Sequence, residues 1–300
     1  MTAHVSMPAT APGRKPYNRD KRRSNLLTVV MWLCVLYFIV PLIWLFISST
    51  KNNSDLFTTF GLWFGHDFNL FANISDVFTY NDGIYLRWSL NTVLYAGVSA
   101  IGASLLATMA GYAFAKYRFP GAKALFSITL GAIMIPLTAL AIPTYLLFSS
   151  AGLTNTPLAV ILPSLVSPFS VFLMRVYAAD AVPDSLIEAA RMDGAGELRI
   201  FWQVALRLLG PGIVTVLLFT LVATWNNYFL PLIMLNSGQL YPLTVGLAQQ
   251  EATSAAGGGA QALFSTVITG SFLSIIPLIF AFLYLQRYWQ TGLSTGGVKG

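Results

Sequence analysis

The charged side chains of this chain are concentrated between Arg175 and Gly212, a polar interval that separates two long apolar runs. Nine of the 28 charged residues (17 Lys and Arg, 11 Asp and Glu) lie in it. At its centre is the segment Glu188–Gly194, with the sequence Glu-Ala-Ala-Arg-Met-Asp-Gly. Acidic and basic groups beside small alanines on a short helix form a surface that a partner protein can grip, with ion pairs selecting the partner. The chemistry that this pattern indicates is docking.

Local signals predict two short helices joined by a sharp turn. Pro183 suits the first turn of a helix, and Ser185 and Glu188 have the spacing of a capping box, so the first helix is predicted to begin near Pro183. Gly194 predicts its end, because a glycine just past a helix adopts the left-handed conformation without a steric penalty. A second helix is then expected from about Glu197.

The second helix is predicted to be amphipathic. Leu198, Phe201, Ala205 and Leu208 fall on one face at helical spacing. Residues 183–209 therefore form a helix–turn–helix unit at a membrane surface, which we call the elbow.

Sequence motifs for catalysis are missing. No lysine is followed by serine or threonine, so the chain has no Walker A loop with which to bind the phosphates of ATP. A Gly-x-Ser-x-Gly nucleophile motif and a His-Glu-x-x-His zinc motif are also absent. We expect no catalytic residue, no metal site and no bound cofactor in this chain.

The lone cysteine and the two histidines offer no reactive pair either. Cys34 lies in an apolar run, which excludes an internal disulfide and a thiol pair for metal or redox chemistry. His4 and His66 stand far apart in polar segments. We interpret both as solvated.

The composition predicts an all-α polytopic membrane protein. The chain is 56% hydrophobic and only 9% charged, and its mean hydropathy is +0.67, which excludes an ordinary soluble surface. Uncharged runs long enough to cross a bilayer predict six transmembrane helices. They are Leu26–Ser48, Leu90–Ala115, Leu125–Phe148, Leu158–Met174, Ile213–Leu235 and Ala262–Leu285.

Two of these runs have further features. Leu26–Ser48 is too long for a typical signal-peptide core and no convincing cleavage site follows it, so it is interpreted as an uncleaved first span after a disordered basic tail, residues 1–25. The fourth run is the shortest and contains Pro163 and Pro168, which predict a kinked or broken helix.

The distribution of Lys and Arg predicts the orientation. Fifteen lie on one side of the six runs, in the tail, near Lys116, in the polar interval Arg175–Gly212 and near Arg287, whereas Lys51 and Arg87 are the two on the other side. By the positive-inside rule both termini and the elbow are cytoplasmic. Because the basic residues are spread over four membrane-proximal segments, they do not form the single basic patch expected of a nucleic-acid-binding protein.

The loops on the outer side carry few charges. Residues 49–88 form the first extracytoplasmic loop, and its aromatics Phe57, Phe60, Trp63, Phe64, Phe68 and Phe71 suggest an interfacial belt in preference to a binding platform. A Gly- and Ala-rich loop is expected at Asn236–Gln261, with a flexible tip at Gly257–Gly259.

The elbow resembles a family signature. Glu188-Ala189-Ala190, then Asp193-Gly194-Ala195, then Phe201, is similar to the EAA loop of permease subunits of bacterial ABC importers, in the form seen in carbohydrate importers. Chance occurrence in a structural connector is the alternative interpretation. The family usually continues with Leu-Pro where this chain has Leu206-Arg207, which leaves open whether the second helix runs on without a kink.

The resemblance extends over roughly residues 90–300. Gly111–Gly121 resembles the exit of the second span and the basic turn that follows it, Trp225–Leu232 resembles part of the fifth span, and Gly292-Leu293 with Gly297–Gly300 resembles the tail. The match favours the subunit that is similar to the six-span permease of maltose importers. Small residues at four-residue spacing, Ala103, Ala107 and Gly111, are also ordinary features of helix packing.

The resemblance implies a fold, partners and a role. The fold would be the type I ABC importer permease fold, with residues 89–287 as its transmembrane domain, a cytoplasmic tail at 288–300, and the elbow as the coupling helix that a separate ATPase grips through Glu188, Ala189, Ala190, Asp193 and Gly194. The partners would be a second permease, two copies of the ATPase, which uses ATP, and an extracytoplasmic substrate-binding protein. The location would be the inner membrane of a bacterium and the cargo a carbohydrate, most simply an oligosaccharide.

Hydrogen-bonding side chains in two of the runs suggest where a sugar passes. A sugar needs uncharged polar groups and aromatic faces, which Ser164, Ser167 and Ser170 in the fourth run and Trp225, Asn226, Asn227 and Tyr228 in the fifth supply. The same groups could instead tie helices together.

The alternative function is an ion-coupled carrier or channel subunit. The six runs lack Asp, Glu, Lys, Arg and His, which disfavours such a carrier. Sodium can nevertheless be held by carbonyls and hydroxyls at broken helices.

Overall fold

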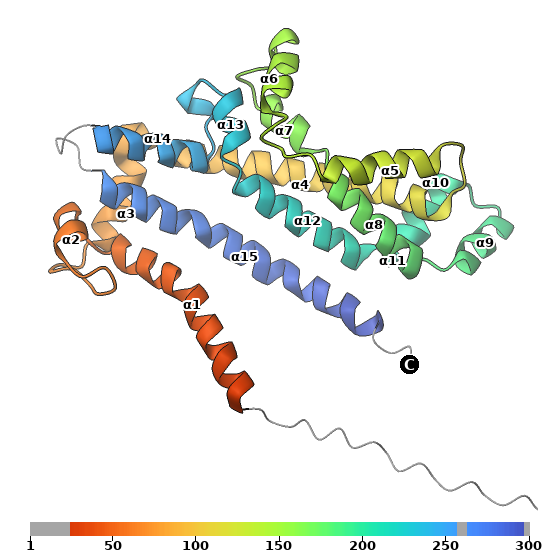
Figure 1. Ribbon diagram of the computed structural model, residues 1–300, viewed down its shortest axis with the longest axis horizontal. Coiled ribbons are helices and arrows are strands. Elements are labelled where there is room, and N and C mark those ends of the chain that lie inside the picture. Colours follow the sequence, from red (N-terminus) through yellow and green to blue (C-terminus); the bar gives the residue numbers. More distant parts are fainter. Residues whose placement is uncertain (1–24, 257–262, 297–300) are drawn as a thin grey trace, which may run out of the picture. The chain divides into compact units, whose positions relative to one another are not determined.

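A computed structural model describes residues 25–256 and 263–296, and over these residues the chain contains helices and no strand (Figure 1). It divides into two compact units, one ending at Ile43 and one beginning at Trp44. Residues 1–24 of the predicted tail and the Gly257–Gly259 loop tip lie outside the described residues. α1, Asn25–Ser49, matches the first predicted span and begins and ends within a residue of it.

The segment predicted as the first extracytoplasmic loop contains two helices, α2 (Asn53–Thr58) and α3 (Leu70–Thr79), and a 3₁₀ turn, η1 (Tyr80–Gly83). α2 begins where the Asn52 side chain accepts a hydrogen bond from the backbone N–H of Asp55, at 2.8 Å. α3 buries Asn73 and Val77, one helical turn apart. These helices are too short and too polar to show as apolar runs, so the sequence did not indicate them, and the extracytoplasmic position of this segment stays a prediction.

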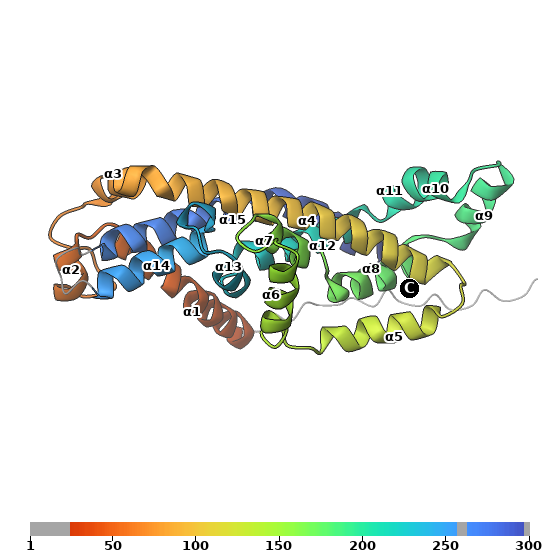
Figure 2. The same cartoon turned by 90° about the horizontal axis from the view of Figure 1, so that it is seen from above.

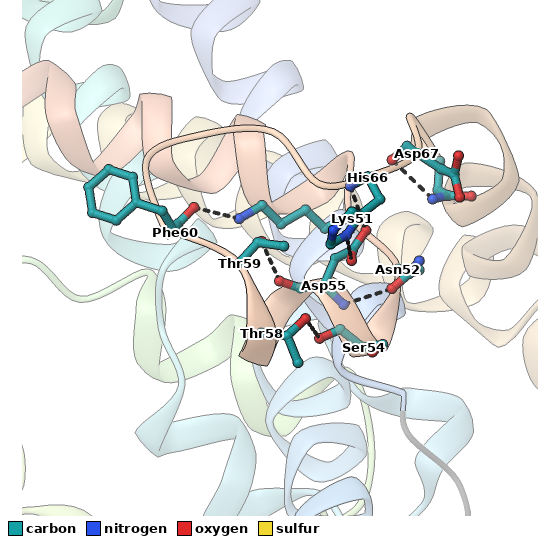
Figure 3. A network of polar contacts seen from close by, with 10 residues as sticks. Lys51, Asn52, Ser54, Asp55, Thr58, Thr59, Phe60, His66 and Asp67 are labelled. Carbon is teal, nitrogen blue, oxygen red and sulfur yellow. Dashed lines mark hydrogen bonds and ion pairs between the residues drawn. The ribbon is translucent and has the colours of Figure 1, made fainter.

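Polar contacts fix the fold of residues 51–67 (Figure 3). The Asp55 carboxylate accepts hydrogen bonds from the His66 ring, at 2.7 Å, and from the His66 backbone N–H, at 3.0 Å. The buried Lys51 donates its ammonium to the carbonyl of Phe60 at 2.9 Å. The His66 ring is exposed, as predicted, but it is also an ion-pair partner, which its position in the sequence did not reveal.

Among the helices whose side chains are all described, the longest is α4, Ile84–Lys116. It begins six residues before the predicted span, after Gly83 at φ +75°. Its small residues, Ala96, Ala100, Ala103, Ala107 and Gly111, are buried, which confirms their role in helix packing. At Gly111 an added Cβ would lie 2.6 Å from the Cβ of Met174, because α4 and the helix that carries Met174 are in close contact.

The third predicted span is two helices. α5, Ala122–Ile133, and α6, Ala141–Ser150, are separated by residues 134–140, which include Pro136. A proline lacks the N–H that an α-helix needs and disfavours helical backbone in the residue before it, so the uncharged run does not form one straight helix. α5 lies against the following span, where the guanidinium of Arg175 is 4.0 Å from the centroid of the Phe126 ring.

The fourth predicted span is also broken, and at the expected place. α7, Leu158–Ser164, and α8, Pro168–Ala181, are separated by three residues. Pro168 occupies the first turn of α8, and the Ser167 side chain caps it. Together they form one apolar stretch of 24 residues.

The fifth predicted span is interrupted at residues 226–228, between α12 (Gly210–Trp225) and α13 (Phe229–Met234). Pro231 has no N–H to donate to the carbonyl of Asn227, four residues earlier. That carbonyl instead accepts a hydrogen bond from the Thr244 hydroxyl at 2.8 Å. The uncharged run 213–235 is therefore broken in the structure, and the run itself did not indicate the break.

The predicted loop Asn236–Gln261 contains a helix. After the 3₁₀ turn η3, Gly238–Leu240, α14 runs from Leu243 to Ala256 and buries Val245, Gly246 and Leu247. An added Cβ at Gly246 would lie 2.2 Å from the indole of Trp88, so α14 packs tightly on α4. α15, Phe264–Gly296, continues well past the predicted end of the last span.

Within the unit that begins at Trp44, α4 lies against α8 and α12, and α12 lies against α15 (Figures 1 and 2). Among the described residues, four stretches are long and apolar enough to cross a membrane, and a fifth is added if the bent pair Glu197–Leu208 and Gly210–Trp225 is one span. The chain thus has the all-helical architecture of a multi-pass membrane protein. The number six stays a prediction.

Candidate functional site

The elbow begins with α9, Asp184–Met192. Pro183 precedes its first residue, with φ −64° and ψ 136°, as the N-cap. The predicted capping box does not form, because Ser185 lies inside the helix and no side-chain hydrogen bond caps it. The helix start was predicted within one residue. Pro183 marks this start, and the Ser185–Glu188 capping box does not contribute to it.

Gly194 ends α9 as predicted. Its φ is +79°, in the left-handed region. The backbone N–H of Ala195 donates to the carbonyl of Ala190, and the N–H of Gly194 donates to the carbonyl of Arg191, both at 3.0 Å. This pair of bonds is the Schellman motif, which fixes the direction in which the chain leaves the helix.

Most of the signature residues in α9 and at its end are exposed. Ile187 is buried and Ala190 is half-buried against the same cluster, whereas Glu188, Ala189, Asp193 and Gly194 are exposed. Among the described residues Glu188 makes no hydrogen bond or ion pair, so its carboxylate is available to a partner. One face of α9 therefore packs against the rest of the chain, and the opposite face, with Glu188 and Ala189, is exposed.

The second helix of the elbow starts at Glu197, as predicted, with α10 (Glu197–Ile200). It continues through a π-helical turn, η2 (Phe201–Ala205), into α11 (Leu206–Leu208). The buried residues are Ile200, Phe201, Ala205 and Leu209, while Leu198 is 75% exposed and Leu208 is only half-buried. The predicted face was thus wrong at Leu198, whereas Leu208 packs, partly buried, against the cluster that contains Phe201 and Ala205. Wider π spacing moves the buried face from position 208 to 209.

The chain bends by 79° where the elbow meets α12. The bend lies at Leu209, and Pro211 stands in the first turn of α12. The second helix therefore does not continue straight into the span, although residue 207 is arginine where the family usually has proline. The break that proline at 207 would make occurs instead just before Pro211.

Two polar contacts hold the elbow on the end of α4, and an ion pair joins the two helices of the elbow to each other. Glu197 accepts from the Arg191 guanidinium and from the hydroxyl of Tyr117, each at 2.7 Å. Lys116 donates to the Asp184 carboxylate at 2.8 Å. α9 is thus bonded to Lys116, the last residue of α4, and α10 to Tyr117, the residue that follows it.

These contacts alter the ionisation of the elbow. The hydrogen bond from Arg191, and then that from Tyr117, lower the pKa of Glu197. The hydrogen bond from Lys116 lowers the pKa of Asp184. Sequence reasoning had not singled out Lys116, Tyr117, Asp184 or Glu197 as functional, because their pairing joins segments that lie 68 and 80 positions apart.

The serines predicted to line a path bond within their own segment. The Ser164 hydroxyl donates to the carbonyl of Val160, at 2.7 Å. The hydroxyls of Ser167 and Ser170 are 2.6 Å apart, and Ser170 is buried. All three serve the break between α7 and α8 in this chain.

The four residues predicted in the fifth span differ in exposure. Trp225 is buried in a cluster with Trp88 and Leu243. Asn227 is half-buried, and its side-chain oxygen accepts from the N–H of Leu230 at 3.2 Å. Asn226 and Tyr228 are exposed at the break between α12 and α13. Of the seven predicted path residues, these two present free polar or aromatic groups.

Comparison with known proteins places this architecture in a family. The chain belongs to the family described as "Binding-protein-dependent transport system inner membrane component", whose pattern matches residues 103–291. It is a transporter permease component and not an enzyme.

Individual relatives cover nearly the whole chain. The arabinooligosaccharides transport system permease protein AraQ of Halalkalibacterium halodurans is 34% identical, covering 92% of this chain and 97% of its own. The lactose transport system permease protein LacG of Rhizobium radiobacter is 30% identical, over 90% of this chain and 94% of its own.

A solved structure shows the same fold. A chain of a bacterial ABC transporter involved in the import of the acidic polysaccharide alginate superposes with a TM-score of 0.76 at 23% identity. The superposition covers 93% of this chain and 100% of that chain.

Proposed function

We propose that this chain is one permease subunit of an ATP-driven importer of oligosaccharides in the inner membrane of a bacterium. With a second permease it would form the translocation path, and a separate ATPase dimer would use ATP to drive it. An extracytoplasmic binding protein would deliver the sugar. The cargo is inferred from the relatives, because AraQ and LacG are named for arabinooligosaccharide and lactose transport.

The observation that carries the proposal is the geometry of the elbow. Glu188 and Ala189 are exposed on a short helix whose exit is fixed by Gly194 at φ +79°, and the helix is bonded to the end of α4 through Lys116 and Asp184. A partner that moves α9 must also move α4. The elbow can therefore pass the closing of an ATPase dimer into the membrane domain.

Six spans remain part of the proposal. In this account α5 with α6, α7 with α8, and α12 with α13 are each one broken crossing, and α1, α4 and α15 are the unbroken ones. Fifteen of the 17 Lys and Arg then fall on one side, which places both termini and the elbow in the cytoplasm. Broken helices are tolerated at membrane depth where they line a cavity or contact other protein.

The sugar is proposed to pass the break at residues 226–228. Asn226 and Tyr228 are exposed there and offer an amide and an aromatic ring. A second permease facing this break would enclose the path. Which sugar is chosen would depend largely on the binding protein.

Copurification and labelling test the proposal. A tagged chain, expressed with its neighbouring transport genes, should copurify with an ATPase and a second permease. In a Cys34→Ser background, a cysteine at Ala195 should react with a membrane-impermeant thiol reagent in inverted vesicles and not in intact cells. Labelling of intact cells would contradict the orientation, and sodium- or proton-driven uptake without an ATPase would show an ion-coupled carrier instead.

A further inference from the structure

α4 makes hydrogen bonds far from the elbow, at its other end. Side chains of its first three turns bond to the backbone between α13 and α14. Trp88 donates its indole N–H to the carbonyl of Gly238 at 2.8 Å, and Tyr95 donates its hydroxyl to that of Leu240 at 2.9 Å. Asn91 donates both hydrogens of its amide, to the carbonyls of Gln239 at 2.8 Å and Tyr241 at 3.0 Å. Four consecutive carbonyls, 238–241, are thus held by one helix.

The same segment is tied to the proposed path. Thr92 of α4 accepts from the backbone N–H of Leu243 at 2.8 Å, and the next residue, Thr244, donates to the carbonyl of Asn227. On the other side, the Asn155 side chain accepts from the N–H groups of Asn236 and Ser237, at 2.9 Å each. We call residues 236–243 the outer segment. It connects α4 to the break at 226–228.

The contacts at the two ends of α4 are far apart. From Asn91 to Lys116 a helix rises about 37 Å, which exceeds the roughly 30 Å of a bilayer's hydrocarbon core. α4 is continuous between them, with no proline. Figure 2 shows it passing from the α3 end of the unit to the end where α9 and α10 lie.

Burial makes the bonds at the outer end effective as a clamp. Trp88, Asn91, Thr92 and Tyr95 are all buried, and the Cβ that Gly246 lacks leaves the space that the Trp88 ring fills. A buried side-chain donor that loses its acceptor costs free energy of desolvation, so detaching the outer segment from Trp88, Asn91 and Tyr95 is unfavourable. The outer segment and the helix are expected to move together.

We propose that Trp88, Asn91 and Tyr95 are positioning residues for coupled transport: they clamp the outer segment to α4, so that movement of the elbow reaches the break at Asn226–Tyr228. This inference rests on the proposed function, because it assigns the route between the elbow and the path. None of the three residues needs to touch the sugar or the ATPase.

The test is the number of ATP molecules hydrolysed for each sugar taken up by the full transporter in vesicles. Asn91→Leu removes both hydrogen bonds that the Asn91 side-chain amide donates. Tyr95→Phe removes only the hydroxyl and its one hydrogen bond to Leu240. Each should keep ATP hydrolysis but slow uptake, raising the ATP-to-sugar ratio several-fold, up to about tenfold, as expected for losing one or two partly buried hydrogen bonds. Ser89→Ala is the matched control, because the Ser89 hydroxyl donates to the carbonyl of Tyr85 in the same helix and, within the described part of the chain, makes no hydrogen bond to the outer segment. Its ratio should be that of the wild type.

The outcomes separate this inference from the function on which it rests. If Gly194→Val uncouples the transporter while Asn91→Leu and Tyr95→Phe assemble normally and keep the wild-type ratio, the clamp is not part of the route and the inference is wrong. If Asn91→Leu fails to assemble, Tyr95→Phe alone decides, since the ring and its packing are kept. If the wild-type complex itself takes up sugar without hydrolysing ATP, the proposed function is wrong.

Discussion

The hydroxyl of Tyr117 donates to the Glu197 carboxylate at 2.7 Å, although the two residues are 80 positions apart. Tyr117 is the first residue after α4, and Glu197 is the first residue of α10. The same carboxylate accepts from Arg191 in the last turn of α9. One side chain thus joins the end of a membrane-crossing helix to both helices of the elbow.

Removing this junction should loosen the elbow without unfolding the protein. Tyr117→Phe and Glu197→Gln should speed amide hydrogen exchange in the segment 193–197 and reduce sugar uptake. The melting temperature should change little, because exposed ion pairs contribute only about 0.2 to 1 kcal/mol. Glu188→Gln is the control for exchange, since Glu188 makes no bond within the described residues. Equal exchange in all three variants and the wild type would contradict the role of Glu197.

The contact between α4 and α8 should tolerate no added atom at Gly111. An alanine Cβ there would lie 2.6 to 2.8 Å from Met174 and the backbone N of Arg175, so two helices must separate. Gly111→Ala should destabilise the subunit by about 1 to 3 kcal/mol. Gly97→Ala, on the same helix, meets nothing within 4 Å and should be neutral or stabilising. Thermal unfolding of the purified complexes measures the difference, and equal melting temperatures would refute the close packing.

The break between α12 and α13 offers a test of the proposed path. Asn226→Leu should reduce uptake and leave assembly intact, because the Asn226 side chain is exposed and bonds to nothing else described. Asn227→Leu should instead reduce the amount of assembled complex, because the Asn227 side chain accepts from Leu230. Uptake and complex yield should be measured together. Normal uptake by Asn226→Leu would remove this residue from the path.

The Asp55–His66 pair predicts a pH dependence of stability. The hydrogen bond that the His66 ring donates to Asp55 raises the pKa of His66 above its ordinary 6.5 and lowers the pKa of Asp55 below 3.8. The contribution of His66 is therefore full below pH 6.5 and is lost as the pH rises through the raised pKa. That of Asp55 is full above pH 3.8 and is lost as the pH falls through the lowered pKa.

Both groups of the Asp55–His66 pair are charged between these two pH limits. The charge of Asp67 also raises the pKa of His66. The melting temperature of the wild type should exceed that of His66→Ala by most at about pH 5 to 6 and by less at about pH 8.5, where the histidine is neutral. The backbone N–H of His66 still donates to Asp55 at high pH, so part of the contact remains. A difference that grows with pH would show that the ion pair does not stabilise this loop.

The start, the end and the turn of the elbow's first helix and the start of its second helix could be predicted from the sequence. Gly194 and Pro183 act through local geometry, and local geometry is readable from single residues. The buried face of the second helix could not be predicted in full, because the π turn at residues 201–205 changes the helical period and no residue type in the sequence indicates such a turn.

Hydropathy located the apolar runs but not their interruptions. Pro168 marked one break, whereas the break at 226–228 depends on a distant hydroxyl, that of Thr244, which replaces the bond that Pro231 cannot make. α14 was missed because its buried face is made by packing against Trp88, which its own composition does not reveal. The clamp at Asn91 joins segments about 150 positions apart and was invisible for the same reason.

The central claim is that the direction of α9, set at Gly194, couples ATP hydrolysis to transport. A side chain at φ +79° costs about 1 to 2 kcal/mol and more when β-branched, so Gly194→Val should turn the signature face away from the ATPase. Glu188→Lys tests the same face by reversing its charge.

Gly196→Val is the matched control, because Gly196 lies two residues away, has φ −72°, and an added Cβ there, as at Gly194, meets nothing within 4 Å. Sugar uptake and substrate-stimulated ATP hydrolysis should be measured side by side in reconstituted vesicles. We predict near-normal subunit levels in all three variants, with little or no sugar uptake and weakened or uncoupled hydrolysis in Gly194→Val and Glu188→Lys, and wild-type values in Gly196→Val. Wild-type uptake and hydrolysis in both Gly194→Val and Glu188→Lys would show that the elbow is not the coupling element.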